Sequence, residues 1–267
     1  MTGRVMIVAG SDSGGGAGIQ ADIKTVTALG GFAMTAITAL TAQNTVGVHG
    51  IYEVPTEFVA DQIRVVMDDL GADCLKTGML HRRGVIDAVM AAIDEHAPTV
   101  PLVVDPVMVA KGGAALLEED AVEGIRNRVL PRATIITPNA PEAAVLTGFA
   151  VDTTEDAVRA GHVLTAMGPG AALVKGGHIE ADGDRVVDVL VSTDGTVETF
   201  EGARIETRHT HGTGCTMASA IAAGLGQGML LRDAVARARS YVLEAIRTAP
   251  GFGHGHGPLN HAHTVRD

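Results

Sequence analysis

The sequence contains very few aromatic residues and very few cysteines. Of its 267 residues, 3% are aromatic, none is Trp and two are Cys. Two cysteines cannot form the disulfide framework of a small secreted protein, and these two do not form the C-x-x-C pair that is typical of a metal site. Because 46% of the residues are apolar, the core must consist mainly of Ala, Val, Ile, Leu and Met, as is usual where helices pack on a parallel sheet.

Long apolar runs and clusters of positive charge are also missing. No stretch approaches the roughly 18 apolar residues of a membrane span. The apolar run at residues 5–9 is too short for the core of a signal peptide. The formal net charge is −11 and Lys and Arg form no block, which argues against a nucleic-acid partner. We therefore expect a cytoplasmic protein.

Short apolar runs alternate with segments of helical periodicity along the chain. The predicted strands are residues 5–9, 32–41, 74–76, 102–104, 134–137 and 172–174, and the predicted helices include 17–28, 59–70, 85–93, 211–226 and 231–247. This alternation predicts an α/β protein with a mostly parallel central sheet. Only four residues separate the apolar segments 186–191 and 196–200, which predicts an antiparallel hairpin at an edge of the sheet. We find no linker, so we expect one domain over residues 1–267, with 255–267 as a flexible tail.

A glycine-rich loop, residues 10–18, lies between the first predicted strand and the first predicted helix. Glycine lets the backbone approach a ligand closely, and the N-terminus of a helix favours anions. The loop is not a dinucleotide fingerprint, because the third glycine of that pattern falls on Ile19, and no Gly-Lys-Ser/Thr closes it as a P-loop. We expect a ligand-facing loop, and a tight turn without function is the alternative.

The strongest local signal is the His-Gly-Thr-Gly-Cys motif at residues 211–215, which opens an Ala-rich helix. The backbone N–H groups of Gly212, Thr213 and Gly214, together with the helix dipole, are expected to stabilise developing negative charge. Cys215 falls in the first helical turn, where a thiol is biased toward the thiolate and can take a proton from an attacking hydroxyl. The alternative is a glycine-rich helix start with a buried, inert cysteine.

Polar residues follow three other predicted strands, at the edge where ligands bind in open α/β sheets. Asp105 follows one strand, and Asn139 and Glu142 follow the next. Carboxylate and amide oxygens suit Mg²⁺, although Asn139 can equally cap a helix. Lys175 follows a further strand and precedes two glycines. It can reach phosphate oxygens as a point charge, and a surface lysine in a turn is its alternative role.

Two further features carry weaker signals. Gln43 follows the Thr-rich second strand, and its amide can donate and accept hydrogen bonds on the edge of an aminopyrimidine or a pyridine. Residues 253–263 are rich in His and Gly. His-x-His pairs can bind Zn²⁺, but the flexible glycines and the lack of a nearby acidic or thiol partner argue against a metal site there.

Taken together, these motifs resemble the hydroxymethylpyrimidine/phosphomethylpyrimidine kinases of thiamine biosynthesis, members of the ribokinase-like superfamily. The resemblance runs in order from about residue 4 to residue 261. It rests on the segments 9–25, 41–45, 76–80, 105–108, 137–142, 174–178 and 211–215 and on the Gly-His-Gly-Pro-Leu-Asn-His ending at 255–261. It implies a three-layer α/β/α fold, and ATP-dependent phosphorylation of 4-amino-5-hydroxymethyl-2-methylpyrimidine and then of its monophosphate. It also suggests a homodimer.

The resemblance assigns roles to individual residues. Gln43 would bind the pyrimidine edge, in a pocket shaped by Asp22, Met79 and Val107 and closed by Gly10 of the glycine-rich loop. Residues 212–214 would form the anion hole next to Cys215. Lys175 and Asn139 would meet the ATP phosphates, and Asp105 and Glu142 would help to hold Mg²⁺. Sugar kinases of this superfamily carry Asp where this chain has Cys215, so the cysteine argues against a sugar substrate.

Other functions compete with this interpretation. A pyridoxal or pyridoxine kinase is the nearest, because its substrate is also a flat heterocycle with a hydroxymethyl group. A nicotinamide oxidoreductase would need the glycine register that the loop lacks. A protein that only binds a ligand would have no use for Cys215, Lys175, Asp105 and Glu142 together. The sequence does not decide whether a monovalent cation assists the reaction.

Overall fold

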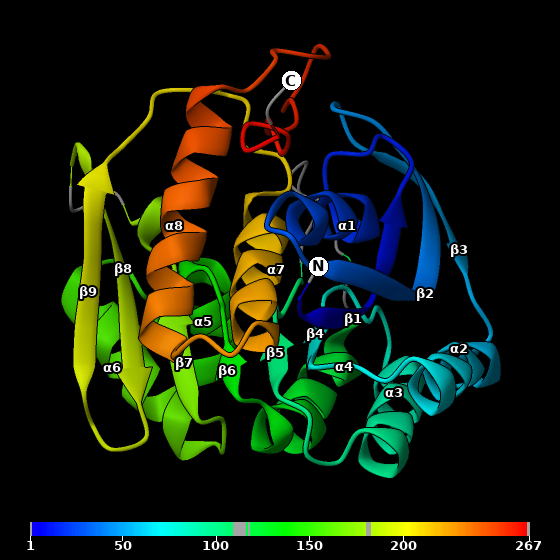
Figure 1. Cartoon of the computed structure of the whole chain (residues 1–267). Helices are drawn as coiled ribbons and strands as arrows, with labels where there is room; N and C mark the ends of the chain where they lie inside the picture. Colours follow the sequence, from blue (N-terminus) through cyan, green and yellow to red (C-terminus); the bar gives the residue numbers. More distant parts are fainter. Residues whose placement is uncertain (1, 109–115, 117, 180–182, 266–267) are drawn as a thin grey trace.

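The computed structural model describes residues 2–108, 116, 118–179 and 183–265 (Figure 1). The strands of this part of the chain are β1 (Arg4–Asp12), β2 (Phe32–Gln43), β3 (Val48–Glu53), β4 (Cys74–Thr77), β5 (Leu102–Val104), β6 (Ile135–Ile136), β7 (Ala171–Val174), β8 (Arg185–Ser192) and β9 (Val197–Ala203). The α-helices are α1 (Gly18–Ala28), α2 (Thr56–Asp69), α3 (Arg83–His96), α4 (Glu119–Gly124), α5 (Ala140–Thr147), α6 (Thr154–Ala166), α7 (Thr213–Gly226) and α8 (Leu231–Arg247).

All nine strands belong to one sheet, in the order β3-β2-β1-β4-β5-β6-β7-β8-β9. The six strands from β2 to β7 in this order are parallel. β3 pairs antiparallel with β2 at one edge, and β8 and β9 form an antiparallel hairpin at the other. Both β2 and β4 are neighbours of β1, so the chain reverses its direction of winding there. The carboxyl ends of β1 and β4 therefore meet at a switch point, where ligands bind in sheets of this kind.

Helices cover both faces of the sheet and make a three-layer α/β/α molecule (Figure 1). Alternate residues of β1 belong to different cores, because successive side chains of a strand point to opposite faces. Val5 and Ile7 pack with α1, α7 and α8, whereas Met6 and Val8 pack with the layer that contains α2, α3, α5 and α6. The mostly parallel sheet and the antiparallel hairpin at its edge are as predicted.

Several elements differ from the sequence prediction: α4 and α6 were not among the predicted helices, and β1 and β3 also differ. β1 extends to Asp12. Ser11 and Asp12, which we expected in the loop, are therefore still paired with β2. β3 was not predicted, and the reason is its burial pattern: five of its six residues are exposed. An edge strand without a buried face leaves no alternation of apolar and polar residues to recognise.

The C-terminal segment packs against the body of the protein as far as the structure describes it. Leu259 and His261 are buried, and the Tyr241 hydroxyl of α8 donates a hydrogen bond to the His261 carbonyl at 2.6 Å. His211 forms a backbone bridge with Pro258. The expectation of a flexible tail over 255–267 therefore needs correction for its described part, because residues spaced among the glycines find partners on α7 and α8.

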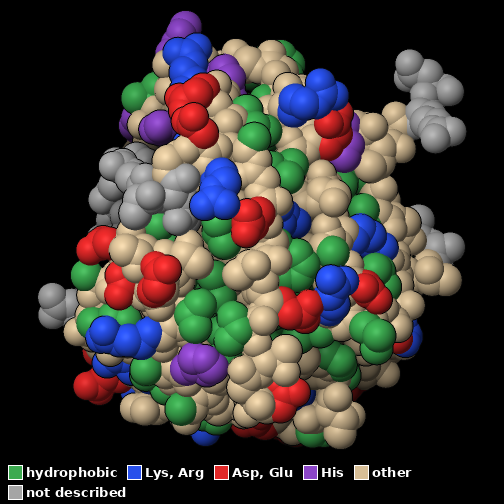
Figure 2. Space-filling view, turned by 90° about the vertical axis from the view of Figure 1, so that its left-hand side faces the viewer, with side chains coloured by type: hydrophobic (Ala, Val, Ile, Leu, Met, Phe, Trp, Pro, Cys, Tyr) green, Lys and Arg blue, Asp and Glu red, His purple; other side chains and the backbone are tan. Residues whose placement is uncertain are grey.

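No helix of the described chain is both long and apolar enough to cross a membrane. Figure 2 shows the face that carries the β8–β9 edge, where Lys and Arg side chains stand singly among Asp and Glu. This mixed surface agrees with the net charge of −11 and offers no basic stripe on that face for a nucleic acid.

Candidate active site

A cavity of about 920 Å³ opens at the carboxyl ends of the parallel strands. Its lining includes all but one of the residues predicted to form the site: Gly10, Gln43, Met79, Asp105, Val107, Asn139, Glu142, Lys175, Gly212, Thr213, Gly214 and Cys215. These residues are dispersed along the sequence and converge because parallel strands end at the same edge of the sheet. The exception is Asp22, which is fully buried behind the cavity wall.

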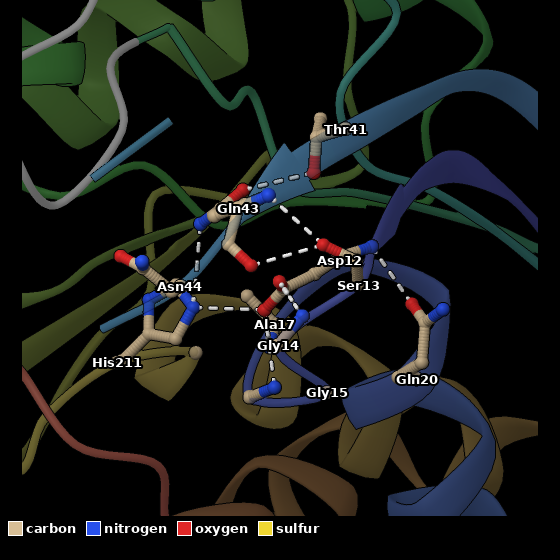
Figure 3. Close-up of polar contacts among 12 residues, drawn as sticks. Asp12, Ser13, Gly14, Gly15, Ala17, Gln20, Thr41, Gln43, Asn44 and His211 are labelled. Atoms are coloured by element: carbon tan, nitrogen blue, oxygen red, sulfur yellow. Dashed lines mark hydrogen bonds and ion pairs between the residues drawn. The ribbon is translucent and has the colours of Figure 1, made fainter. Parts of the chain in front are cut away.

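The glycine-rich loop is folded around the carboxylate of Asp12 (Figure 3). Asp12 accepts hydrogen bonds from the backbone N–H groups of Gly14, Gly16 and Ala17, at 2.8, 3.0 and 2.8 Å. His211 Nε2 lies 2.9 Å from Asp12 Oδ2. Burial alone would raise the pKa of Asp12, but the hydrogen bond with His211 and those from the backbone lower it. Asp12 therefore ties the loop to the residue that precedes the anion hole, a role that the sequence analysis missed.

Gln43 lies beside Asp12 and His211 (Figure 3). Its backbone N–H and carbonyl both pair with the Ser13 hydroxyl, at 2.9 Å each. Its side-chain amide lies 3.2 Å from Thr41 Oγ1 and 3.4 Å from His211 Nε2. The amide is therefore held between two polar neighbours with one edge toward the cavity. Such a group can read the hydrogen-bonding edge of a flat heterocycle.

The first turn of α7 forms the middle of the cavity wall. Gly212 has a φ of 84°, and a Cβ at this position would lie 1.9 Å from the Gly16 carbonyl oxygen, so only glycine fits. The Thr213 N–H donates to the Thr210 carbonyl at 3.3 Å, and the Thr216 N–H donates to the Gly212 carbonyl at 2.9 Å. The N–H groups of Gly214 and Cys215 have no acceptor within the helix. Of the predicted donors, Thr213 therefore uses its N–H within the turn, while the N–H groups of Gly214 and Cys215 stay available to a ligand.

The protonation state of Cys215 also differs from the prediction. Burial raises the pKa of the thiol to about 12, and Asp22 and Asp105 raise it further, while Lys76 and the Gly18 N–H act in the opposite direction. In the ligand-free protein the helix N-terminus therefore does not produce a thiolate at neutral pH. The side chain still lines the cavity, where a substrate can reach it.

The opposite end of the cavity carries a cluster of charged groups. Lys175 Nζ lies 3.1 Å from Asp105 Oδ1, and a Cβ on Gly214 would lie 3.1 Å from the same ammonium. Glu142 and Asn139 form a capping box at the start of α5, in which each side chain accepts from the other's backbone N–H, at 2.8 and 2.9 Å. Both the capping role and the position at the cavity that we predicted for Asn139 are therefore observed.

The carboxylates of this cluster fit a divalent cation. Burial raises the pKa of Glu142 to about 7, and Asp105 raises it while Lys175 opposes the rise. Two carboxylates that repel each other in a partly desolvated site are stabilised by a cation between them. The described residues contain no group of three or more His, Cys, Asp or Glu that could hold a metal alone. Protein sites hold Mg²⁺ through one or two carboxylates, with substrate phosphates and water as the other ligands.

Asp22 forms a fully buried ion pair beneath the cavity. Its carboxylate lies 2.9 and 3.0 Å from Lys76 Nζ and accepts a hydrogen bond from the Ser219 hydroxyl at 2.6 Å. Lys76 lines the cavity, whereas Asp22 does not. The prediction that Asp22 shapes the substrate pocket directly is therefore corrected, since its charge reaches the cavity through Lys76.

Comparison with known proteins agrees with this geometry. The family model "Phosphomethylpyrimidine kinase" matches residues 12–260. The "Thiamine biosynthesis bifunctional protein ThiED" of Geobacter sulfurreducens is 51% identical over 99% of this chain, which spans 54% of the length of that relative. The "Hydroxymethylpyrimidine/phosphomethylpyrimidine kinase" of Streptomyces coelicolor is 49% identical over 96% of this chain and 93% of its own length.

Among solved structures, an ADP complex of pyridoxal kinase from Bacillus subtilis superposes with a TM-score of 0.89. It is 32% identical and covers 98% of both chains. Its likeness supports the ribokinase-like fold and shows that a nucleotide binds in this architecture. The family match over most of the chain, and an identity near one half to a relative of nearly the same length, are decisive: the chain belongs to the phosphomethylpyrimidine kinase family.

Proposed function

We propose that this protein transfers the γ-phosphoryl group of ATP to 4-amino-5-hydroxymethyl-2-methylpyrimidine and then to the resulting monophosphate. The observation that carries the proposal is that one cavity brings these groups together. The Gln43 amide lies 3.4 Å from His211, which precedes α7, and a Cβ on Gly214 of α7 would lie 3.1 Å from Lys175 Nζ, so the start of α7 lies between Gln43 and Lys175. This is the order of base recognition, reacting hydroxyl and phosphate donor that the reaction requires.

The heterocycle would bind between the glycine-rich loop and the ends of β2 and β4. The Gln43 amide would hydrogen-bond the aminopyrimidine edge, and Met79 and Val107 would pack against the ring. A Cβ on Gly10 would lie 2.5 Å from Met79 Cε, so Gly10 leaves the room that Met79 occupies. A flat ring placed there has its hydroxymethyl group directed toward the first turn of α7.

In the first phosphorylation, Cys215 would act as the general base. Because burial keeps Cys215 protonated in the ligand-free protein, the thiol must first release its own proton to solvent. The substrate O–H bond then breaks, its proton passes to the Cys215 thiolate, and the freed oxygen forms a bond to the γ-phosphorus while the bond to the ADP oxygen breaks. The N–H groups of Gly214 and Cys215 would stabilise the charge on the transferring group. The remaining catalysis is positioning and charge neutralisation of an in-line transfer.

The ATP would lie across the far half of the cavity. Lys175 would neutralise phosphate oxygens, with Asn139 beside them, and Asp105 and Glu142 would hold Mg²⁺ together with those phosphates. Bound Mg²⁺ supplies charge neutralisation of the phosphates. Beyond the phosphates, the cavity is lined by apolar side chains of α8, namely Val242, Leu243 and Ile246, which suit the face of a purine ring.

We further propose that the protein is a homodimer, as the family resemblance suggests. Large apolar side chains are exposed on the loop before β3, on β3 itself and on the neighbouring α2: Val46 (61% exposed), Tyr52 (71%) and Phe58 (58%), respectively. Exposed apolar groups on an open edge strand are an unfavourable surface for a monomer. Light scattering behind size-exclusion chromatography should give twice the chain mass, and a monomer at micromolar concentration would contradict this proposal.

Product analysis tests the function directly. Reactions with Mg·ATP should contain the pyrimidine, its monophosphate or pyridoxal, each alone, with products identified by mass spectrometry. Formation of the pyrimidine pyrophosphate ester from both pyrimidine compounds supports the proposal. Pyridoxal phosphate as the only product would favour the second candidate, a pyridoxal kinase, which the likeness to the Bacillus subtilis enzyme keeps in view.

A further inference from the structure

Lys76 is a buried lysine that lines the same cavity as Cys215, and the proposed chemistry does not use it. Lys76 and Asp22 both have side chains that are 0% exposed. Burying an ion pair costs more than burying apolar residues of the same volume in many proteins, so such a pair is weak evidence for stability. The position of the pair beside the reacting groups points to another role.

Residues of two helices, α1 and α7, lie around this ion pair. On α7, Cys215 and Ser219 are four residues apart and share one face, and on α1, Gly18 and Asp22 are also four residues apart. The Ser219 hydroxyl donates to Asp22 Oδ1 at 2.6 Å. The ion pair is therefore bonded to the residue that lies one helical turn after Cys215 on the same face of α7.

The ammonium of Lys76 reaches this place from the end of β4. A Cβ on Gly78 would lie 2.9 Å from Lys76 Nζ, so the chain leaves room for the charge by having no side chain at residue 78. Lys76 also lines the cavity. Its charge is thus fixed between Asp22 on one side and the site of reaction on the other.

We propose that Lys76, held by Asp22, is a positioning residue for Cys215: it fixes a positive charge beside the thiol and so favours the thiolate that accepts the substrate proton. The inference rests on the proposed function of Cys215 as the base. The proposed role explains why a lysine is buried at this position. Lys175 does not take this role, because it is paired with Asp105 in the part of the cavity proposed for the phosphates.

The other charges around Cys215 come from several elements. Asp22 of α1 and Asp105 after β5 disfavour the thiolate, whereas Lys76 of β4 favours it and has a larger effect than either carboxylate alone. Lys175 after β7 is also coupled to the thiol, besides its stronger coupling to Asp105 and Glu142. After burial, the charge of Lys76 has the largest effect on the pKa of Cys215. Removing this charge should therefore have a measurable effect.

The test measures the reactivity of the thiol and needs no turnover. Alkylation of Cys215 by iodoacetamide is followed by peptide mass spectrometry from pH 6.5 to 9.5, with the buried Cys74 as the internal control. The variant is Lys76→Met/Asp22→Asn, which removes both charges, avoids an unpaired buried carboxylate and keeps an acceptor for Ser219. Ser219→Ala is the matched control, because it removes a hydrogen bond from the same cluster but no charge.

We expect Cys215 alkylation in the double variant to be about 3- to 15-fold slower at a given pH, with the profile moved to higher pH. Ser219→Ala should follow the original protein. An unchanged profile in a double variant that unfolds at a similar temperature would overturn the inference. If the double variant does not fold, Lys76→Gln/Asp22→Asn, which also removes both charges and keeps polar groups at both positions, provides the same comparison. A chain that shows the predicted shift but phosphorylates nothing would refute the proposed function and leave only the effect of Lys76 on the thiol standing.

Discussion

At the residue scale, the two phosphorylations place different demands on Cys215. In the first, a neutral alcohol attacks the γ-phosphorus and must lose a proton. In the second, the attacking group is a phosphate monoester, whose second pKa is about 6 and which is therefore already deprotonated at pH 8. A base in the middle of the cavity should matter for one step and hardly for the other.

This difference gives a prediction for Cys215→Ala. We expect kcat/KM for the hydroxymethylpyrimidine to fall about 100- to 10,000-fold, the usual contribution of a general base. We expect kcat/KM for the monophosphate to change much less. Steady-state kinetics on each substrate alone measures both values, with Cys74→Ala as the control thiol. Equal losses on the two substrates would show that Cys215 positions substrates and does not take a proton.

Gly212 allows a second comparison of single residues. Gly212→Ala introduces a Cβ 1.9 Å from the Gly16 carbonyl, whereas Gly30 has nearly the same backbone angle, φ 80°, and a Cβ there would meet nothing within 4 Å. Both changes carry the left-handed penalty of roughly 1 kcal/mol. Only Gly212→Ala displaces the glycine-rich loop from α7, and a displacement of this kind can cost about 100-fold in rate.

Turnover and thermal unfolding of the two variants separate these effects. Gly30→Ala should lose some stability and keep its turnover. Gly212→Ala should lose both. If the two variants were equally active, contact between the start of α7 and the glycine-rich loop would not matter for catalysis.

At the scale of elements, the C-terminal segment supports α7. His261 Nε2 lies 2.9 Å from the hydroxyl of Thr216, in the second turn of α7. Burial, followed by the charges of Lys24 and His263, lowers the pKa of His261 to about 4. An imidazole in the unfolded chain takes a proton as the pH falls through 6.5, but the folded protein resists protonation until about pH 4. The unfolded state therefore binds more protons between these values, and folding becomes less stable as the pH falls.

The sign of this effect yields a prediction for His261→Gln. Between pH 7.5 and pH 4.5, the original protein should lose about 2 kcal/mol more of its unfolding free energy than the variant. Urea unfolding of both proteins at the two pH values measures the difference. Equal losses would mean that His261 is already protonated in the folded protein, or that the C-terminal segment leaves α7 at low pH.

The sequence predicted elements where a buried face left a pattern. The core strands were recognisable as short apolar runs, and the hairpin by the short connection between β8 and β9. β3 was missed because it has no buried face, and the C-terminal segment because its glycines resemble those of a flexible tail. Local patterns report burial and turn chemistry, and an element that lacks both cannot be predicted from them.

At the scale of the whole molecule, the strand order explains why the site was predictable. Motifs that follow parallel strands must meet at one edge, so Asp105, Asn139 and Lys175 could be placed together before their contacts were known. The pairings of Asp12 with His211 and of Asp22 with Lys76 could not. Their partners are 199 and 54 residues apart, and nothing in a single sequence links the members of such a pair. The same limit hid the effect of burial on Cys215.

The central claim is that one cavity carries out both phosphorylations of the pyrimidine. The most direct measurement is a time course with Mg·ATP and 4-amino-5-hydroxymethyl-2-methylpyrimidine as the only acceptor, in which all pyrimidine species are quantified by mass spectrometry. The account predicts that the monophosphate forms first and that the pyrophosphate accumulates from it. A reaction that yields no phosphorylated pyrimidine, with protein that is folded and binds ATP, would contradict the account.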